Sequence, residues 1–418
     1  MRQLNAWIEK RKAGTFSETP LADGTFEYAF EYDGASEQNI VSLTMVPTED
    51  ELRFESRVFP PPFDMILPEG ERRAKIEEAR KILRTDSFSL LSYVGANPVN
   101  RVQFLEPGQI PSESPPEIPT PPEIAQTRNG QEVFRALLER IDLRQGVAGV
   151  QPKVLGTANL QKVSAELRQF RGSTHLLKAS TTRYPFLAAN EHLCLSTFAR
   201  AGVEVPKNTL SADGELLLVE RFDIRADGSF AGFEEAAALM GETSATKYLR
   251  DYGTMMNVMC DFVPPQEQRN AREVLSKCIL LNHLLGNGDA HLKNFGVLFE
   301  DSQNVRIAPA YDCVTTLAYT PDDVPALALS FEWYSKAWWP RQKLEEFLTM
   351  YGSLSHAQAR KIIEECCDAT LRGAEEVVKL GKEVPGFKML SQKIAEIWNN
   401  RVRNFLDEPG IPKRRRNY

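Results

Sequence analysis

The sequence lacks long apolar runs. No stretch approaches the roughly 18 consecutive apolar residues that a membrane-spanning helix needs. The opening residues, MRQLNAWIEKRKAG, contain no apolar core of the kind found in secretory signal peptides. We therefore expect no secretory signal and no contact with a membrane.

Cysteine and histidine are scarce and dispersed. None of the six cysteines stands in C-x-x-C spacing, and the five histidines form no cluster. The cysteines lie at positions 194, 260, 278, 313, 366 and 367. This pattern excludes a disulfide framework and a zinc site of the common kinds, and it predicts reduced thiols in the cytoplasm.

The chain also lacks an excess of positive charge. Its net charge is −7, whereas a dedicated nucleic-acid-binding protein is usually basic. The exception is the stretch KRRR, Lys413 to Arg416, which is either a solvated tail or an electrostatic contact with a phosphate backbone in a larger complex. An apolar content of 42% is ordinary for a globular protein, and 418 residues suffice for two or three domains.

One segment carries most of the chemistry that is present. Residues 286–298 read GNGDAHLKNFGVL, and APAYDCV follows up to Val314. Asp289 and Asn294 stand in D-x-x-x-x-N spacing, which protein kinases use for a catalytic loop. In such a loop the Asp orients the attacking hydroxyl and accepts its proton, and the Asn holds Mg²⁺.

A second carboxylate follows this loop. Residues 295–299 are apolar, residues 300–304 are polar, and a second short run covers residues 305–308, which predicts a β-hairpin that returns the chain toward the loop. Asp312 comes next, so its carboxylate can reach the metal that Asn294 holds. The alternative is a helix that ends at Gly286, with Asp289 and Asn294 as ordinary turn residues. Spacing alone leaves both open, because D-x-x-x-x-N is common and no Walker loop supports it.

Several further motifs follow one another in a fixed order. They are FDMILPEG at 63–70, GVAGVQPK at 146–153, THLLK at 174–178, Asn190-Glu191, VERFD at 219–223, and D-x-H-x-K-N-F followed by Y-D-x-V around Asp289 and Asp312. Together these motifs resemble the HipA family of toxin kinases, and the similarity extends over nearly the whole chain.

The resemblance implies an α+β, two-lobed, protein-kinase-like fold with an additional N-terminal α/β subdomain. We predict an N-terminal subdomain over 1–105, a Pro-rich extended linker over 106–130, a small β-rich nucleotide-binding lobe over 131–225 and a mostly helical catalytic lobe over 226–418. The linker prediction depends on residues 107–122, which are rich in Pro, Ser and Glu.

Periodicity and turn signals predict the individual elements. The expected strands are 25–32, 41–45, 175–178 and 215–221, with a hairpin turn at 211–214. The expected helices are 66–83, 87–94, 131–141, 190–200, 271–285, 341–351, 356–380 and 388–405.

The nucleotide would contact both lobes. Lys178 ends an apolar strand, where a buried ammonium must be compensated, and ATP phosphates would provide this. The resemblance adds Gly149, Gln151 and Lys153 from the Gly-rich loop and makes Glu191 a candidate ion-pair partner of Lys178. It also implies that Glu220 and Phe222 form the adenine hinge, mostly through backbone hydrogen bonds, and that His291 contacts ATP. A buried structural imidazole is the alternative for His291.

Two departures from the family pattern stand out. The family often begins its nucleotide loop with a serine that becomes phosphorylated and inactivates the enzyme, but this chain has Gly146 there. Inactivation by that modification is therefore impossible at this position. Asn100-Arg101 stands where the family usually has Gly-Ala, which weakens the resemblance in the N-terminal subdomain.

The function implied by the resemblance is an ATP- and Mg²⁺-dependent serine/threonine protein kinase that acts as a toxin. The family's targets include aminoacyl-tRNA synthetases, and its neutraliser is a HipB-like helix-turn-helix antitoxin through which DNA is contacted indirectly. Two alternatives remain: a small-molecule or lipid-type kinase of the same fold, and a co-repressor that binds a DNA-bound antitoxin. The complete set of Asp289, Asn294 and Asp312 argues against a pure co-repressor, since a binding surface has no need of metal ligands.

Overall fold

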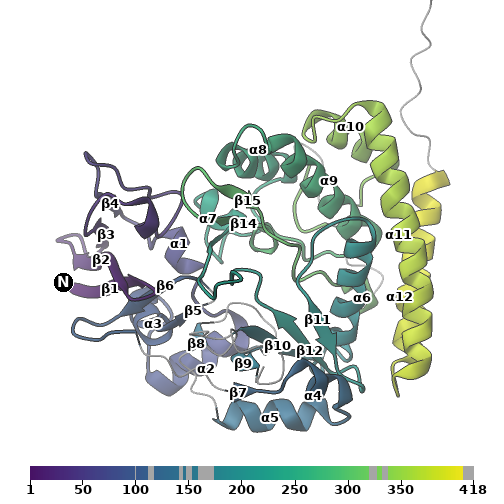
Figure 1. Cartoon of the computed structure of the whole chain (residues 1–418), viewed down its shortest axis with the longest axis horizontal. Coiled ribbons are helices and arrows are strands. Elements are labelled where there is room, and N and C mark those ends of the chain that lie inside the picture. Colours follow the sequence, from purple (N-terminus) through teal and green to yellow (C-terminus); the bar gives the residue numbers. More distant parts are fainter. Residues whose placement is uncertain are drawn as a thin grey trace, which may run out of the picture. The chain divides into compact units, whose positions relative to one another are not determined.

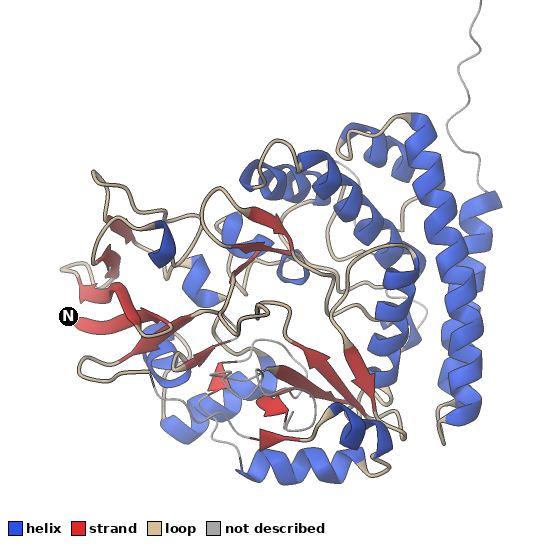
Figure 2. Ribbon diagram, in the orientation of Figure 1, coloured by secondary structure: helices blue, strands red, loops and turns tan. Residues whose placement is uncertain are grey.

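The computed structural model describes residues 1–98, 100–111, 117–140, 145–146, 153–158, 174–319, 327–331 and 338–407. The chain divides into two compact units. Unit 1 consists of Met1–Pro185, Pro206–Lys247 and Gly296–Ala308, and unit 2 of Phe186–Val205, Tyr248–Phe295 and Pro309–Tyr418. Figures 1 and 2 show the elements of the two units, which are small sheets with helices in unit 1 and mainly helices in unit 2. Together they confirm the α+β class.

Unit 1 begins with an antiparallel sheet in the order β4-β3-β2-β1-β6. Its strands are β1 (Arg2–Ile8), β2 (Arg11–Pro20), β3 (Phe26–Tyr32), β4 (Arg53–Ser56) and β6 (Val102–Leu105). One face carries a cluster of aromatic rings, in which Phe16 contacts Phe63, Phe88 and Phe104. The helices of this region are α1 (Pro61–Asp64), α2 (Gly70–Arg80) and α3 (Ser87–Val94). The prediction of helix 87–94 is confirmed, and helix 66–83 is shorter than predicted.

The predicted strand over residues 41–45 is wrong. This segment is an irregular turn, although its apolar residues Val41, Leu43 and Met45 are buried. Side chains rather than a neighbouring strand satisfy its backbone. The Val41 N–H donates to the Tyr32 hydroxyl, which donates to the Met45 carbonyl, and the Leu43 N–H donates to Glu234. Burial alone therefore mimicked the signature of a strand.

A second sheet of unit 1 has the order β11-β12-β10-β9-β7. Its strands are β7 (Glu117–Ile118), β9 (Lys153–Ala158), β10 (His175–Ala179), β11 (Asn208–Leu210) and β12 (Leu216–Glu220). Helices α4 (Pro121–Gln126) and α5 (Gly130–Arg140) supply Ile124, Phe134 and Leu137 to a core with Leu177 and Leu218.

The end of the predicted linker is part of this sheet, which corrects the expectation of an unpacked extended segment. Ile118 pairs in parallel with Ala158 and is buried. Pro121 and Pro122 occupy the first turn of α4, where proline fits because the first helical N–H groups have no intrahelical partner. Thr120 and Glu123 close this helix end with a capping box. Pro121 and Pro122 therefore mark a helix start.

Two smaller sheets complete unit 1. Strands β13 (Gly232–Glu235), β14 (Gly296–Phe299) and β15 (Val305–Ile307) form an antiparallel sheet, and β13 leads into α7 (Ala236–Leu239). The β14–β15 pair is the predicted hairpin, which is confirmed. Strands β5 (Asn97–Pro98) and β8 (Gln145–Gly146) form a short parallel pair.

Unit 2 is mainly helical. It contains α6 (Leu187–Arg200), α8 (Tyr252–Phe262), α9 (Gln268–Leu284), α10 (Arg341–Met350), α11 (His356–Glu383) and α12 (Lys388–Asp407). Helices α11 and α12 lie side by side, and Figure 1 shows this pair at the yellow-green end of the chain. The predicted helices at 190–200, 271–285, 341–351, 356–380 and 388–405 are confirmed, each with a boundary shifted by a few residues.

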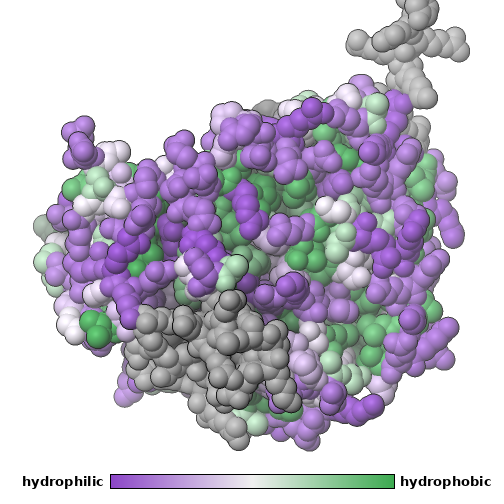
Figure 3. Space-filling view, viewed as in Figure 1, coloured by the Kyte–Doolittle hydropathy of each residue, from purple (hydrophilic) through white to green (hydrophobic). Residues whose placement is uncertain are grey.

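No helix among the described residues has both the length and the apolar character needed to cross a bilayer. On the face drawn in Figure 3, hydrophilic residues predominate and apolar residues form scattered groups.

Candidate active site

The loop from Gly286 to Asn294 follows helix α9 in unit 2 and ends in a single 3-10 turn, Leu292–Asn294. Gly286 has φ +70°, and a Cβ atom there would lie 2.7 Å from Leu317 Cδ1. Only glycine combines this backbone conformation with so close an approach. Gly286 therefore ends the helix, as the alternative interpretation of this segment had predicted. It also lets the loop approach the segment around Leu317.

Buried side chains fix the loop backbone. The Tyr252 hydroxyl donates to the Ala290 carbonyl at 2.8 Å, and burial raises the pKa of Tyr252, so this donor keeps its proton. Asn287 donates to Asn282 Oδ1 at 2.7 Å and accepts from the Asp289 N–H at 3.0 Å. Side chains of α8 and α9 thus determine the course of the loop on both sides of Asp289.

The Asp289 carboxylate is accessible to solvent, and one of its two oxygens is held by a hydrogen bond. Its side chain is 55% exposed, as a group that meets a substrate hydroxyl must be. Tyr248 donates its hydroxyl to Asp289 Oδ1 at 2.6 Å, and the Tyr248 ring meets the His291 ring edge to face at 4.9 Å. His291 Nε2 lies 4.0 Å from the same oxygen, and the His291 side chain is buried.

The segment after the hairpin lies against this loop. Thr316 Oγ1 accepts from the Gly288 N–H at 2.8 Å and donates to the Gly286 carbonyl at 3.2 Å. The Tyr311 hydroxyl donates to the Lys293 carbonyl at 2.9 Å. These bonds flank Asp312 on both sides, so the structure brings the Asp312 segment to the loop that carries Asp289 and Asn294.

Asp312 itself has a left-handed backbone with φ +53°, which is uncommon for a residue other than glycine. The next residues are held tightly. Asn190 at the start of α6 accepts from the Thr315 N–H at 2.9 Å and donates to the Thr315 carbonyl at 3.1 Å. The Trp398 indole donates to Thr315 Oγ1 at 2.8 Å. Asn190 was recognised in the sequence only as part of a motif, and the structure assigns it to holding this segment.

The donor chemistry of this site fits Mg²⁺. Two carboxylates and one amide oxygen are hard ligands, and Mg²⁺ is usually held by one or two carboxylates together with substrate phosphates and water. Asn294 Oδ1 already accepts from the His291 N–H at 3.1 Å, which fixes the amide orientation and leaves a second lone pair on that oxygen. Within the described ranges no three His, Cys, Asp or Glu side chains gather as metal ligands. Asn294 and Asp312 would supply one amide oxygen and one carboxylate, so substrate phosphates and water would complete a Mg²⁺ site of this composition.

The residues predicted to bind nucleotide belong to unit 1. Lys178 is buried in β10, with Leu217 of β12 and Lys153 of β9 as its register partners. Because successive side chains alternate between the faces of a strand, Lys178 faces away from the core that contains Leu177 and Ala179. Lys153 begins β9, and Gly149 and Gln151 lie outside the described residues.

The predicted hinge follows directly on β12. Glu220 is its last residue, and its N–H donates to the Lys207 carbonyl at 2.8 Å. Phe222 packs edge to face against Phe233 at 5.4 Å, so its ring has a packing role in unit 1. Arg221 and Asp223 form a buried two-point ion pair and stiffen the segment. Glu220 and Phe222 therefore lie beside the strand that carries Lys178, on a segment with a fixed course.

Sequence reasoning missed Tyr248, Tyr252 and Thr316. The hydroxyl of each residue contacts the loop 286–294, which is distant in sequence. No spacing pattern in the sequence predicts such a contact. The only available signal was indirect: a loop with an exposed carboxylate requires side chains from elsewhere to fix it.

Known proteins resemble this chain over most of its length. Residues 145–374 match the HipA-like C-terminal domain, and residues 4–105 match the HipA N-terminal domain. The protein named "Putative kinase Y4mE" from Sinorhizobium fredii is 30% identical over 346 residues, which cover 79% of this chain and 80% of the relative. The serine/threonine-protein kinase toxin HipA of Shewanella oneidensis is 25% identical over 61% of this chain and 62% of its own length.

A solved structure of HipA from Shewanella oneidensis, in complex with HipB and operator DNA, superposes with a TM-score of 0.71. The match covers 96% of this chain and 97% of that one at 18% identity, a level at which it establishes the fold alone. The predicted kinase-like fold is thereby confirmed. With both of its domain patterns matched, the chain belongs to the HipA family of toxin kinases.

Proposed function

We propose that this protein is an ATP- and Mg²⁺-dependent serine/threonine protein kinase. The observation that carries the proposal is the joining of the Asp289–Asn294 loop to the Asp312 segment by the hydrogen bonds of Thr316 and Tyr311. In this proposal Asp289 is the base, Asn294 and Asp312 are the metal ligands, and these hydrogen bonds are the support for their common site. The names of the relatives support kinase chemistry.

Each residue then has one task. Asp289 accepts the proton of the attacking hydroxyl and orients that hydroxyl toward phosphorus. Asn294 and Asp312 hold Mg²⁺, which neutralises charge on the phosphates when it is bound. Lys178 contacts phosphate oxygens together with Gly149, Gln151 and Lys153, while Glu220 and Phe222 border adenine and His291 contacts ATP. Catalysis in such a site is mainly positioning and charge neutralisation, because the transition state is loose.

The same proposal places the protein in the cytoplasm as the toxin of a HipBA-like toxin–antitoxin system. Its partner would be a HipB-like helix-turn-helix antitoxin, and it would meet DNA only through that antitoxin. The structural relative was solved with HipB and operator DNA, which supports this partner. The protein substrate would be a component of translation such as an aminoacyl-tRNA synthetase.

The decisive variant is Asp289→Asn. It keeps the size of the side chain but cannot accept the substrate proton, so we expect phosphoryl transfer to fall by roughly 10²- to 10⁴-fold. The melting temperature should stay close to that of the parent, because the carboxylate is exposed. Radiolabelled ATP with a casein acceptor measures transfer, and growth arrest on induction measures toxicity.

Asp368→Asn is the matched control, because Asp368 is an exposed aspartate on α11 that pairs with Arg372 at the surface. It should retain full activity and toxicity. An Asp289→Asn protein that still arrests growth would favour the co-repressor alternative. Transfer to small hydroxyl compounds but to no protein would favour the small-molecule alternative.

A further inference from the structure

Tyr248 contacts the proposed catalytic base and belongs to no motif of the sequence. Its hydroxyl is a single donor 2.6 Å from Asp289 Oδ1, and its ring is braced edge to face against His291. A carboxylate accepts hydrogen bonds on both oxygens, so Oδ2 stays available for a substrate hydroxyl. An aspartate that is 55% exposed would otherwise rotate freely. The tyrosine therefore restricts the base to one orientation.

The chain just before Tyr248 is held by the N-terminal part of unit 1. The Ser244 N–H donates to Asp64 Oδ2 at 2.7 Å. Lys247 forms an ion pair with Glu69 at 2.7 Å, and the two side chains are only 10% and 13% exposed. Asp64 and Glu69 both belong to the FDMILPEG segment, to which the kinase chemistry assigns no task.

The chain just after Tyr248 is held as well. Asp251 caps helix α8 by accepting from the Thr254 N–H at 2.8 Å, and the Tyr252 N–H donates to the Ser330 carbonyl. Only Leu249 and Arg250 separate Tyr248 from this anchor. Tyr248 thus lies on a short span fixed at both ends, next in the chain to a nearly buried ion pair.

We propose that Tyr248 is a positioning residue for Asp289, and that Asp64 and Glu69 of the N-terminal subdomain set the position of Tyr248 through residues 244–247. The inference rests on the proposed kinase function. It gives the N-terminal subdomain a role in catalysis: a change that loosens the Glu69–Lys247 pair releases the base from its productive orientation.

Tyr248→Phe tests the first part, because it removes the hydroxyl and keeps the ring against His291. With MgATP and casein as probes and the full-length protein, we expect kcat to fall about tenfold while the KM for ATP stays within twofold. Tyr93→Phe is the matched control, since the Tyr93 hydroxyl accepts a hydrogen bond from Arg80 in the N-terminal subdomain. An active parent whose Tyr248→Phe variant keeps its kcat within twofold would overturn the inference. An inactive parent would count against the kinase function instead.

Glu69→Gln tests the second part. We expect a fall in kcat of about fivefold, again without a change in the KM for ATP. The double variant Lys247→Glu with Glu69→Lys restores the opposite charges and should recover most of the loss. Recovery separates positioning from general damage to the fold, and a double variant no better than Glu69→Gln contradicts the coupling.

Hydrogen–deuterium exchange gives a readout that needs no turnover. In the Glu69→Gln protein, exchange should rise in peptides from residues 243–248 and also in those from residues 286–291. A rise confined to residues 243–248 would show that the Asp289 loop does not depend on the Glu69–Lys247 ion pair, and the proposal would fail.

Discussion

At the scale of single residues, Glu234 is unusual because it is a buried carboxylic acid that accepts its hydrogen bonds from uncharged groups. It lies in β13 and accepts hydrogen bonds from the Ser42 hydroxyl at 2.7 Å and the Leu43 N–H at 2.8 Å. Burial is the largest influence and raises the pKa of Glu234 to about 7, although both hydrogen bonds oppose the rise. The residue therefore titrates close to physiological pH.

The direction of the effect on stability follows from this shift. The unfolded chain releases the Glu234 proton near its ordinary pKa of 4.5, whereas the folded chain holds it to about 7. The associated stability is present below pH 4.5 and is lost as pH rises through about 7. The loss attributable to this group amounts to about 3 kcal/mol of unfolding free energy.

We expect Glu234→Gln to remove this pH dependence. The amide can place its oxygen toward the Leu43 N–H and its NH₂ toward Ser42 Oγ, so both contacts survive. Urea unfolding at pH 5 and pH 8 should show the variant gaining stability relative to the parent as pH rises. Glu31→Gln, at a 62%-exposed position paired with Arg53, is the control and should leave the difference unchanged. Parallel pH profiles for the parent and Glu234→Gln would contradict the assignment.

At the scale of elements, the segment that follows β15 depends on helix α6. Both atoms of the Asn190 amide are engaged by the Thr315 backbone, and Asn190 is completely buried. Since Asp312 adopts a left-handed backbone just before this anchor, its orientation depends on how firmly Thr315 is held. The start of α6 thus acts as a support for a proposed metal ligand.

We therefore expect Asn190→Ala to lower the free energy of unfolding by more than the loss of the side-chain atoms alone would. The Thr315 N–H and carbonyl would stay buried without these partners, which destabilises by about 1–3 kcal/mol. We also expect MgATP to bind more weakly, as measured by calorimetry, because the Asp312 segment loosens. Asn208→Ala is the control, since Asn208 is half-buried in β11 and its amide donates to the nearby Pro206 carbonyl. Unchanged MgATP affinity in a folded Asn190→Ala protein would argue against the supporting role.

The elements also show what the sequence could and could not predict. The long helices of unit 2 were predictable because their apolar periodicity persists over many turns, as in His356–Glu383. The β14–β15 hairpin was predictable from two apolar runs around a polar turn. Residues 41–45 were not, because buried irregular backbone satisfied by Tyr32 and Glu234 has the composition of a strand. The contact of Tyr248 with Asp289 was equally invisible, because a single hydrogen bond across 41 residues leaves no pattern.

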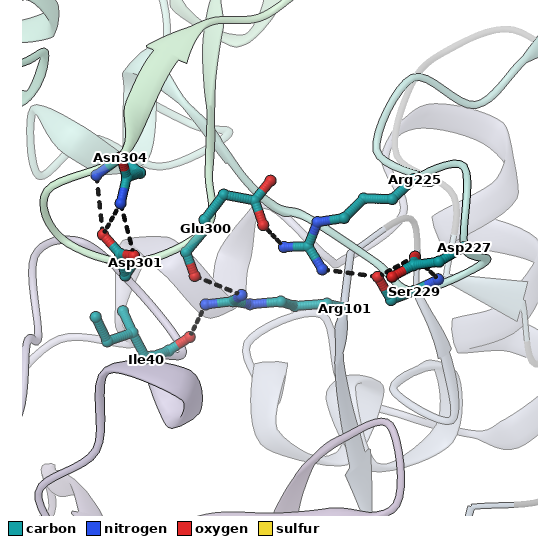
Figure 4. A network of polar contacts seen from close by, with 8 residues as sticks. All are labelled: Ile40, Arg101, Arg225, Asp227, Ser229, Glu300, Asp301 and Asn304. Carbon is teal, nitrogen blue, oxygen red and sulfur yellow. Dashed lines mark hydrogen bonds and ion pairs between the residues drawn. The ribbon is translucent and has the colours of Figure 1, made fainter.

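At the scale of the whole molecule, Arg101 joins distant parts of unit 1 (Figure 4). Its guanidinium donates to the Ile40 carbonyl at 2.8 Å and to the Glu300 carbonyl at 3.2 Å, and it stacks over Phe299. Burial lowers the pKa of Arg101 to about 10, and the neighbouring Arg225 adds to this. Arg225 itself pairs with the Glu300 carboxylate. The departure Asn100-Arg101 from the family pattern thus has a structural use, because it ties the first sheet to the β14–β15 hairpin.

We expect Arg101→Lys to destabilise the protein by about 1–3 kcal/mol, since an ammonium is a point donor and cannot reproduce the planar fork between the two carbonyls. Thermal and urea unfolding measure the loss. Arg53→Lys, which alters an exposed pair with Glu31 and Glu55, should change stability by less than about 0.5 kcal/mol. An Arg101→Lys protein as stable as the parent would mean that the contact with Phe299 alone suffices.

The division of the chain has a consequence for its synthesis. In order along the chain, the stretches 1–185, 186–205, 206–247, 248–295, 296–308 and 309–418 alternate between unit 1 and unit 2, so the chain passes between them five times. A ribosome must therefore release residue 308 before the strand pair β14–β15 can complete unit 1. It must release nearly the entire chain before the long helices α11 and α12 can complete unit 2. A translation product interrupted earlier completes neither unit and lacks the segment around Asp312.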